Sequence, residues 1–311
     1  MTIWRRAVLS EYFVLYLSVI WFAVVSPVTP GFASAENIAN IFSSMLPLLV
    51  VAMGQTVVLI TGGIDLSVTS TVALTSTAGA LLMTKQDGAA VVIAAVAAMI
   101  AIGIVAGALN GFAIHALRMP PFIVTLTAMM FFSGFAIWLT QSRNIYELPR
   151  MFTAIGGGLA GSVAIAAGTA AVLHYTLTHT SLGRWLYAIG RNAKTSLVSG
   201  VPVSRTTVAA YTISGVCAAL ASILYTGRLE TGSPVLGQRI LLDVIGATVI
   251  GGTSLFGGRG KVLWTVFGVL FMTLVDNSLN LLGLSNFAVL MAKGFVILGA
   301  ALLDAARQRY A

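Results

Sequence analysis

The sequence predicts an all-α, polytopic membrane protein, and three observations support that prediction. Of the 311 residues, 58% are hydrophobic and only 8% are charged, and the mean hydropathy is +0.97. A soluble domain averages about 25% charged residues, so these charges are too few to cover a water-facing surface. Apolar runs near the ~20 residues that span a bilayer recur along the chain. Because the runs are continuous rather than alternating, they argue against a β-barrel.

Ten segments are candidate membrane spans, and we expect eight to ten transmembrane helices, with ten favoured. They are residues 12–29, 38–60, 67–84, 89–117, 122–140, 161–179, 205–226, 240–256, 262–282 and 286–304. The segments 67–84 and 240–256 are short and rich in glycine. We therefore expect some broken or re-entrant helices, which a membrane tolerates only where protein or a water-filled path covers the backbone.

The first segment resembles a secretory signal peptide. A basic pair precedes an apolar run at 12–25, and Ala-Ser-Ala at 33–35 imitates a cleavage site. However, Glu11 abuts the run, and Pro27 and Pro30 separate it from the Ala-Ser-Ala. We therefore expect an uncleaved first span.

The basic residues predict the orientation. With ten spans and both termini cytoplasmic, eleven Lys or Arg residues lie inside and five lie outside. The inside residues are Arg5, Arg6, Arg118, Arg184, Arg191, Lys194, Arg205, Arg259, Lys261, Arg307 and Arg309. The outside residues are Lys85, Arg143, Arg150, Arg228 and Arg239. The positive-inside rule favours this orientation, so the net charge of +8 indicates topology and contact with membrane lipid, not nucleic-acid binding.

The longest predicted cytoplasmic segment, residues 181–205, has four basic residues and no acidic one. Within it, Asn192–Ser199 is expected to form a short helix that Gly200 and Pro202 stop. A short helix parallel to the membrane on that face is a docking element rather than a span.

No motif for catalysis, metal binding or nucleotide binding is present, so we expect no enzyme activity and no cofactor on this chain. The run GGTSLFGGRGK at 251–261 fails the Walker pattern, because the first glycine is missing and Val262 follows Lys261. The three histidines stand near span ends without a hydrolase or metal motif. The single cysteine, Cys217, excludes a disulfide framework.

The stretch LITGGIDLSVTS at 59–70 places polar residues between two apolar segments. Gly62 and Gly63 can end the second span, and Asp65, or alternatively Ser67, can cap the next helix. Intramembrane acids are costly, and helix breaks are also where transporters expose polar groups to cargo. A structural role and a role in transport therefore both stay open.

A second glycine pair, Gly251 and Gly252, ends a similar apolar run in the eighth span, which predicts a second helix break. In the fourth span, Gly103, Gly107 and Gly111 recur every four residues. This small-xxx-small face predicts close helix packing within the subunit, with a dimer seam as the alternative.

Charged residues in the last spans suggest an ion pair. Asp276 and Lys293 lie at similar distances from the loop between their spans, so we expect them to pair. The alternative is that they line a polar path with Asn277 and Asn280. Arg239 and Asp243 are one turn apart and are expected to satisfy each other.

Several blocks together resemble the permease subunits of ribose-type ABC sugar importers, the second carbohydrate uptake class. They are GQTVVLITGGIDLSVTS at 54–70, NGFAIHALRMPPFIVTL at 110–126, GRNAKTSLVSGVPV at 190–203, LDVIGATVIGGTSLFGGRGKV at 242–262 and DNSLNLLGLSNFAVLMAKGFVIL at 276–298. They follow the family's order over nearly the whole chain.

The resemblance implies a single transmembrane domain over residues 1–311 in the bacterial inner membrane. It implies a second permease subunit, identical or a sister chain, two ATPase subunits or one fused double ATPase, and a periplasmic sugar-binding protein. ATP and Mg would bind the ATPase. Residues 183–205 would be the cytoplasmic coupling segment, with ATPase contacts at Gly190, Arg191, Asn192, Lys194, Gly200 and Arg205.

The four outside arginines, Arg143, Arg150, Arg228 and Arg239, have two interpretations. They are solvated loop charges, or they form a docking surface for the acidic binding protein. The chain also departs from the family pattern. Leu241 replaces a glutamate, Gly237-Gln238-Arg239-Ile240 replaces a Gly-x-Gly-Tyr-like run, and Asp276 stands where asparagine is expected.

Two functions from different classes follow. The first is the permease subunit of an ATP-driven importer of a small neutral sugar, such as a pentose, a hexose or a related polyol. Its path would be lined by Gln55, Asp65, Ser67, Asn110, Asn277 and Asn280. A permease for nucleosides is a variant. The second is a self-sufficient transporter driven by an ion gradient, with Asp65, Asp276 and Lys293 as coupling groups.

Overall fold

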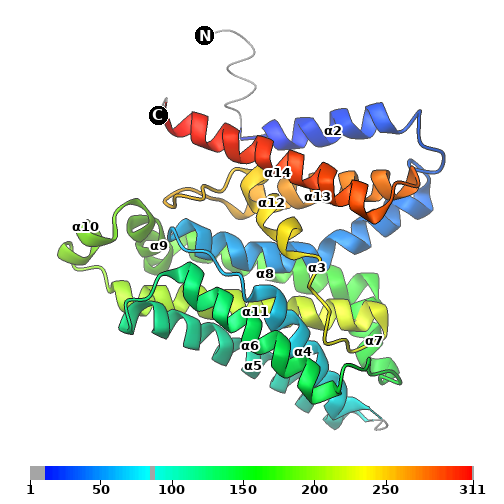
Figure 1. Cartoon of the computed structure of the whole chain (residues 1–311), viewed down its shortest axis with the longest axis horizontal. Helices are drawn as coiled ribbons and strands as arrows, with labels where there is room; N and C mark the ends of the chain where they lie inside the picture. The colour runs from blue at the N-terminus through cyan, green and yellow to red at the C-terminus, as the bar shows by residue number, and fades with distance from the viewer. Residues whose placement is uncertain (1–10, 85–87, 310–311) are drawn as a thin grey trace.

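The computed structural model describes residues 11–84 and 88–309, and within them the chain is built from α-helices (Figure 1). The helices are α2 (Phe13–Val25), α3 (Ala35–Ile60), α4 (Val68–Met83), α5 (Ala89–Ala116), α6 (Pro121–Thr140), α7 (Arg150–Gly157), α8 (Leu159–His179), α9 (Ser181–Arg191), α10 (Ala193–Val198), α11 (Val203–Leu229), α12 (Leu241–Gly251), α13 (Val262–Leu281) and α14 (Asn286–Arg309). Arg5, Arg6 and Lys85 lie outside the described residues, as do the side chains of Arg307 and Arg309.

In the described part of the chain, six helices are long and apolar enough to cross a membrane: α3, α5, α6, α8, α11 and α13. Four shorter apolar helices accompany them: α2, α4, α12 and the Asn286–Leu302 part of α14. The helices α4 and α12 have 16 and 11 residues, fewer than the ~20 that span a bilayer. They coincide with the two segments that the sequence predicts to be short. The all-α membrane class is thus confirmed.

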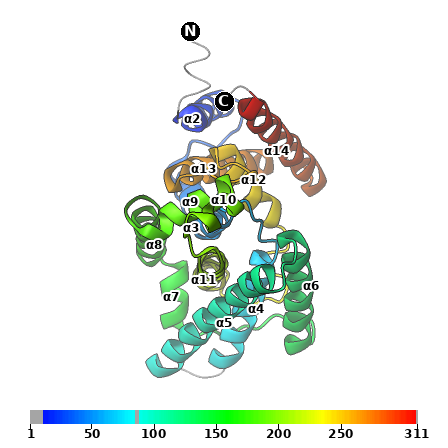
Figure 2. The same ribbon diagram turned by 90° about the vertical axis from the view of Figure 1, so that its left-hand side faces the viewer.

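The helices α3 and α11 lie at the centre of the molecule, with α5, α6, α8 and α14 at its edges (Figure 2). From Met45 to Ile60, α3 is buried on all sides, as expected for a helix that is apolar around its whole circumference. In the outer helices α5, α6 and α8, only 28%, 22% and 17% of the most apolar 18-residue stretch is buried within the chain. This is the pattern of a protein whose outer surface faces lipid.

Glycines on α5 allow it to pack directly on α11. A Cβ at Gly103 would collide with the carbonyl oxygen of Gly215, and one at Gly107 would collide with that of Tyr211. A Cβ at Gly111 would lie 2.6 Å from the Cα of Val208. The predicted close packing within the subunit is confirmed. The dimer seam is wrong for this face, because α11 of the same chain occupies it.

Replacing Gly107 by alanine is expected to lower the free energy of unfolding by about 1–3 kcal/mol, because the new methyl group forces α5 away from α11. Gly168 in α8 is the matched control, since a Cβ there meets nothing within 4 Å. Thermal unfolding in detergent measures both variants. Equal melting temperatures for the two would contradict the packing argument.

Candidate functional site

The helix break between α3 and α4 is built around Asp65. Gly62 adopts a φ of +78°, and helical structure resumes at Val68. The Asp65 Oδ1 accepts from the backbone N–H of Ser67 (3.0 Å) and from its hydroxyl (2.7 Å). Because α4 begins at Val68, Ser67 occupies its N-cap position, but the Ser67 side chain accepts no hydrogen bond from the first turn of the helix. The carboxylate of Asp65 supplies the acceptor instead.

Side chains from the surrounding helices hold this segment in place. The Gln55 amide of α3 faces the Asp65 backbone, in the orientation that lets its nitrogen donate to the Asp65 carbonyl (3.1 Å) and its oxygen accept from the Asp65 N–H (3.3 Å). The Ser214 hydroxyl of α11 donates to Asp65 Oδ2 (2.8 Å). The Asn110 Nδ2 of α5 donates to Ser67 Oγ (2.8 Å). Three helices thus satisfy the polar groups that the break exposes.

The four predicted path residues Gln55, Asp65, Ser67 and Asn110 are therefore brought together, but they are enclosed. Their exposed fractions are 0%, 2%, 1% and 4%. Their polar atoms bond one another, the Ser214 hydroxyl and the backbone rather than an open surface. In this conformation they form the scaffold of the helix break, and their part in a transport path stays a prediction.

The other two predicted path residues lie on α13. The amides of Asn277 and Asn37 exchange two hydrogen bonds (2.9 and 3.0 Å), which join α13 to the start of α3. Asn280 is exposed and donates to the Asp276 carbonyl (2.7 Å). Of the six residues, Asn280 is thus the most accessible, since it is exposed, whereas Asn277 is half-buried and the other four are buried.

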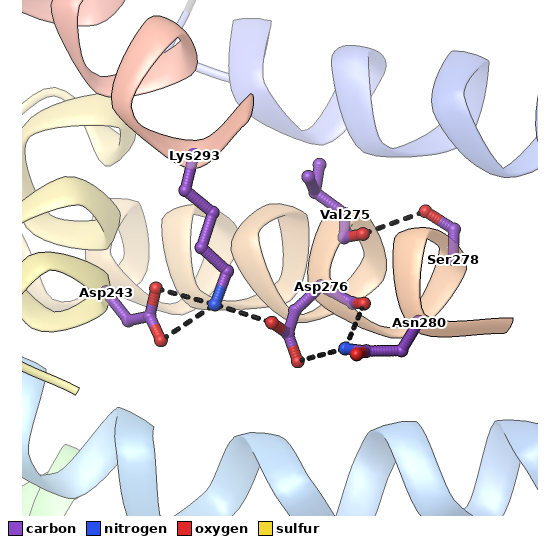
Figure 3. Close-up of polar contacts among 6 residues, drawn as sticks. All are labelled: Asp243, Val275, Asp276, Ser278, Asn280 and Lys293. Atoms are coloured by element: carbon purple, nitrogen blue, oxygen red, sulfur yellow. Dashed lines mark hydrogen bonds and ion pairs between the residues drawn. The ribbon is translucent and has the colours of Figure 1, made fainter. Parts of the chain in front are cut away.

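Lys293 of α14 lies between two aspartates (Figure 3). Its Nζ is 2.5 Å from Asp276 Oδ1 on α13 and 3.0 Å from Asp243 on α12. The structure thus contains the predicted contact of Asp276 with Lys293 and adds a third group. The expected pairing of Arg239 with Asp243 is wrong, because α12 packs on α14 and turns Asp243 toward Lys293. Arg239 is exposed and forms no ion pair with the described residues.

The helices α9 and α10 stand at one end of the molecule, at the left of Figure 1. The predicted short helix is present as α10, and Asn192 Oδ1 accepts from Thr195 N (3.0 Å) at its start. Gly200, with a φ of +82°, follows its end. At its tip Leu197 and Val198 are 63% and 89% exposed.

The predicted ATPase-contact residues Arg191, Asn192, Lys194, Gly200 and Arg205 are also exposed, whereas Gly190 is half-buried. Sequence reasoning missed α9, although Leu186 and Ile189 recur at helical spacing and are both buried.

The second glycine pair ends α12. Gly251 is the last residue of that helix, and Gly252 adopts a φ of +114°. The loop that follows reaches α3, because Gly258 N donates to the carbonyl of Ile60 (2.8 Å). The two predicted helix breaks are thus neighbours in space at the α9–α10 end.

At the opposite end of the molecule, Arg143, Arg150 and Arg239 are exposed. Arg228 is not free, because it donates to Asn40 Oδ1 (2.8 Å) and Ser44 Oγ (2.9 Å) of α3. A hollow of about 540 Å³ lies at this end and is lined by Asn144 and the loop 229–240. Arg150 begins the short helix α7, which sequence reasoning missed even though Pro149 precedes an amphipathic run.

Comparison with known proteins identifies the family. Residues 37–301 match the model described as "Branched-chain amino acid transport system / permease component". The chain is 35% identical to the ribose import permease protein RbsC of Escherichia coli K12, over 97% of this chain and 96% of the relative.

Two further relatives agree. RbsC of Bacillus subtilis 168 is 40% identical, over 90% of this chain and 88% of the relative. The D-allose transport system permease protein AlsC of Escherichia coli K12 is 31% identical, over 95% and 90%. No solved structure gives a significant match. The chain therefore belongs to the ribose-type family of ABC importer permeases that its sequence blocks indicated.

Proposed function

We propose that this chain is the membrane permease subunit of an ATP-driven importer of a small neutral sugar. The observation that supports this most directly is the similarity to sugar permeases over nearly the whole chain. The transported solute is a pentose, a hexose or a related polyol. The alternative solute is a nucleoside, carried by a permease of the same architecture.

The proposed topology has ten passes in the bacterial inner membrane and both termini in the cytoplasm. The six long apolar helices account for six passes, and each of the four shorter helices completes one pass together with the non-helical chain beside it. In Figure 1, α14 ends toward the same end as α9 and α10. In the described part of the chain, at least five exposed cations lie at that end, against three at the opposite end, which supports its assignment to the cytoplasm by the positive-inside rule: Arg184, Arg191, Lys194, Arg205 and Arg259.

The helices α9 and α10 are the proposed docking element for the ATPase, within the coupling segment 183–205. Their exposed cations flank the apolar tip Leu197–Val198, a combination suited to burial in a partner's groove. ATP and Mg bind the ATPase, and this chain holds no cofactor. Two ATPase subunits, or one fused double ATPase, drive a pair of permease chains between inward-open and outward-open states.

On the opposite face the periplasmic binding protein delivers the sugar. The hollow lined by Asn144 and residues 229–240 is the proposed entrance, and the exposed Arg143, Arg150 and Arg239 are the proposed docking charges. The hollow contains Gly237-Gln238-Arg239-Ile240, the run that departs from the family pattern. The selectivity for cargo is therefore proposed to reside at this entrance.

The docking proposal is tested by replacing Leu197 and Val198 with aspartate. The double variant is expected to lose the ATPase that co-purifies with the wild-type chain in mild detergent, because two charges cannot enter an apolar groove. Leu117→Asp is the control, since Leu117 is a 62% exposed leucine after α5. Undiminished recovery of the ATPase with the double variant, or no ATPase with the wild type, would count against the proposal.

A further inference from the structure

Three segments meet at the α9–α10 end, and at their centre the backbone of Gly190 lies directly against the backbones of Ile60 and Gly258. The three segments are α9, the loop 252–261 between α12 and α13, and the last turn of α3. Glycines of the first two segments make this possible, and we call the set Gly190, Gly257 and Gly258 the glycine joint.

The backbone approach in the glycine joint is too close for any larger residue. A Cβ on Gly190 would collide with the carbonyl oxygen of Ile60 and with the amide nitrogen of Gly258. A Cβ on Gly257 would lie 2.8 Å from both the Gly190 oxygen and the Gly62 nitrogen. Gly257 and Gly258 also have φ values of +86° and +72°, which only glycine adopts without strain.

Two hydrogen bonds fix the loop to both of its neighbours. Gly258 N donates to the Ile60 carbonyl (2.8 Å), which ties the loop to α3. The Tyr187 hydroxyl of α9 donates to the Gly260 carbonyl (2.7 Å), which ties the loop to α9. Burial raises the pKa of Tyr187, so the phenol stays a protonated donor.

The glycine joint directly precedes the helix break. Ile60 is the last residue of α3, and Asp65 lies within the segment that follows. The backbone of Gly190 contacts the backbones of Ile60 and Gly258 directly. When α9 is displaced, no flexible side chain at this contact can change rotamer to absorb the movement, so Ile60 and Gly258 must move with it. The segment 61–67 is in turn bonded to α5 and α11 through Asn110 and Ser214.

From this geometry we infer that Tyr187 and the glycine joint are positioning residues for coupled transport. When the ATPases close and move α9, the joint passes that movement to the helix break between α3 and α4. This inference rests on the proposed function, since it needs an ATPase docked on α9 and α10.

The test is Tyr187→Phe in the complete importer, reconstituted in vesicles with its ATPase and binding protein. ATP hydrolysis and uptake of radiolabelled D-ribose and D-allose are measured in the same preparation. Hydrolysis is expected to stay within about twofold of wild type, and sugar moved per ATP is expected to fall about fivefold, the effect of losing one neutral hydrogen bond. Tyr175→Phe is the control, because Tyr175 is a 61% exposed tyrosine of α8.

Three results would overturn the inference. The first is that Tyr187→Phe moves as much sugar per ATP as wild type. The second is that ATP hydrolysis and sugar uptake fall in parallel, which indicates a general structural role. The third is that the ATPase is lost from the complex, which makes Tyr187 a docking residue. A wild-type complex that hydrolyses ATP without moving either sugar would instead count against the proposed function.

Discussion

Replacing Lys293 by methionine is expected to destabilise the protein by about 3 kcal/mol or more. The change leaves Asp243, whose side chain is 15% exposed, without its cation and next to a second carboxylate, Asp276. Removing one partner of a buried ion pair costs about 3–5 kcal/mol, because the remaining charge stays in a poorly solvating environment. Thermal unfolding in detergent, followed by tryptophan fluorescence, measures the loss.

Two further variants make that prediction specific. Glu11→Gln removes the partner of Lys261 in an ion pair whose side chains are both about half exposed, so it is expected to cost about 0–1 kcal/mol. Combining Lys293→Met with Asp243→Asn removes the unpaired buried charge and is expected to restore much of the stability. If Lys293→Met melts at the same temperature as Glu11→Gln, the three-residue cluster does not support the packing of α12, α13 and α14.

Asp65→Leu is expected to abolish transport and to destabilise the helix break. Leucine cannot accept hydrogen bonds, so the backbone N–H of Ser67 and the hydroxyl of Ser214 lose their acceptor in a buried site. Each unsatisfied buried group costs about 1–3 kcal/mol. The variant is measured by uptake in the reconstituted importer and by thermal unfolding.

Asp65→Asn is the matched variant, and it separates the two classes of function. An asparagine keeps an acceptor oxygen for Ser67, and its amide can donate to the Ser214 hydroxyl, which rotates to accept. If Asp65 only holds the helix break, Asp65→Asn is expected to retain more than half of the ATP-driven uptake. If Asp65 instead exchanges protons in a transporter driven by an ion gradient, the amide abolishes uptake while the protein stays folded.

The features that the sequence predicted correctly depend on local chemistry. The glycine pair and the Asp-Leu-Ser run mark the break after α3 because chain reversal and capping are decided within a few residues. Asn192 and Gly200 bound α10 for the same reason. The spacing of Gly103, Gly107 and Gly111 predicts a flat helix face, and α11 occupies that face.

The features that the sequence missed depend on tertiary contacts. Arg239 lies one turn from Asp243, but the packing of α14 against α12 decides that Lys293 is the partner. Gln55 and Asn110 are polar residues in apolar helices. A polar residue in such a helix can either line a transport path or join an internal hydrogen-bond network, and the residue type alone does not decide between the two. Only the fold shows that their hydrogen bonds are directed at the break.

The central claim is that this chain moves sugar only as part of an ATP-driven complex. The most direct measurement is uptake of radiolabelled D-ribose and D-allose into vesicles that contain the purified permease, with and without its ATPase, enclosed ATP and the binding protein. We predict uptake only when all three are present, and no effect of collapsing the ion gradients. Uptake by the permease alone, driven by a proton or sodium gradient, would contradict the claim.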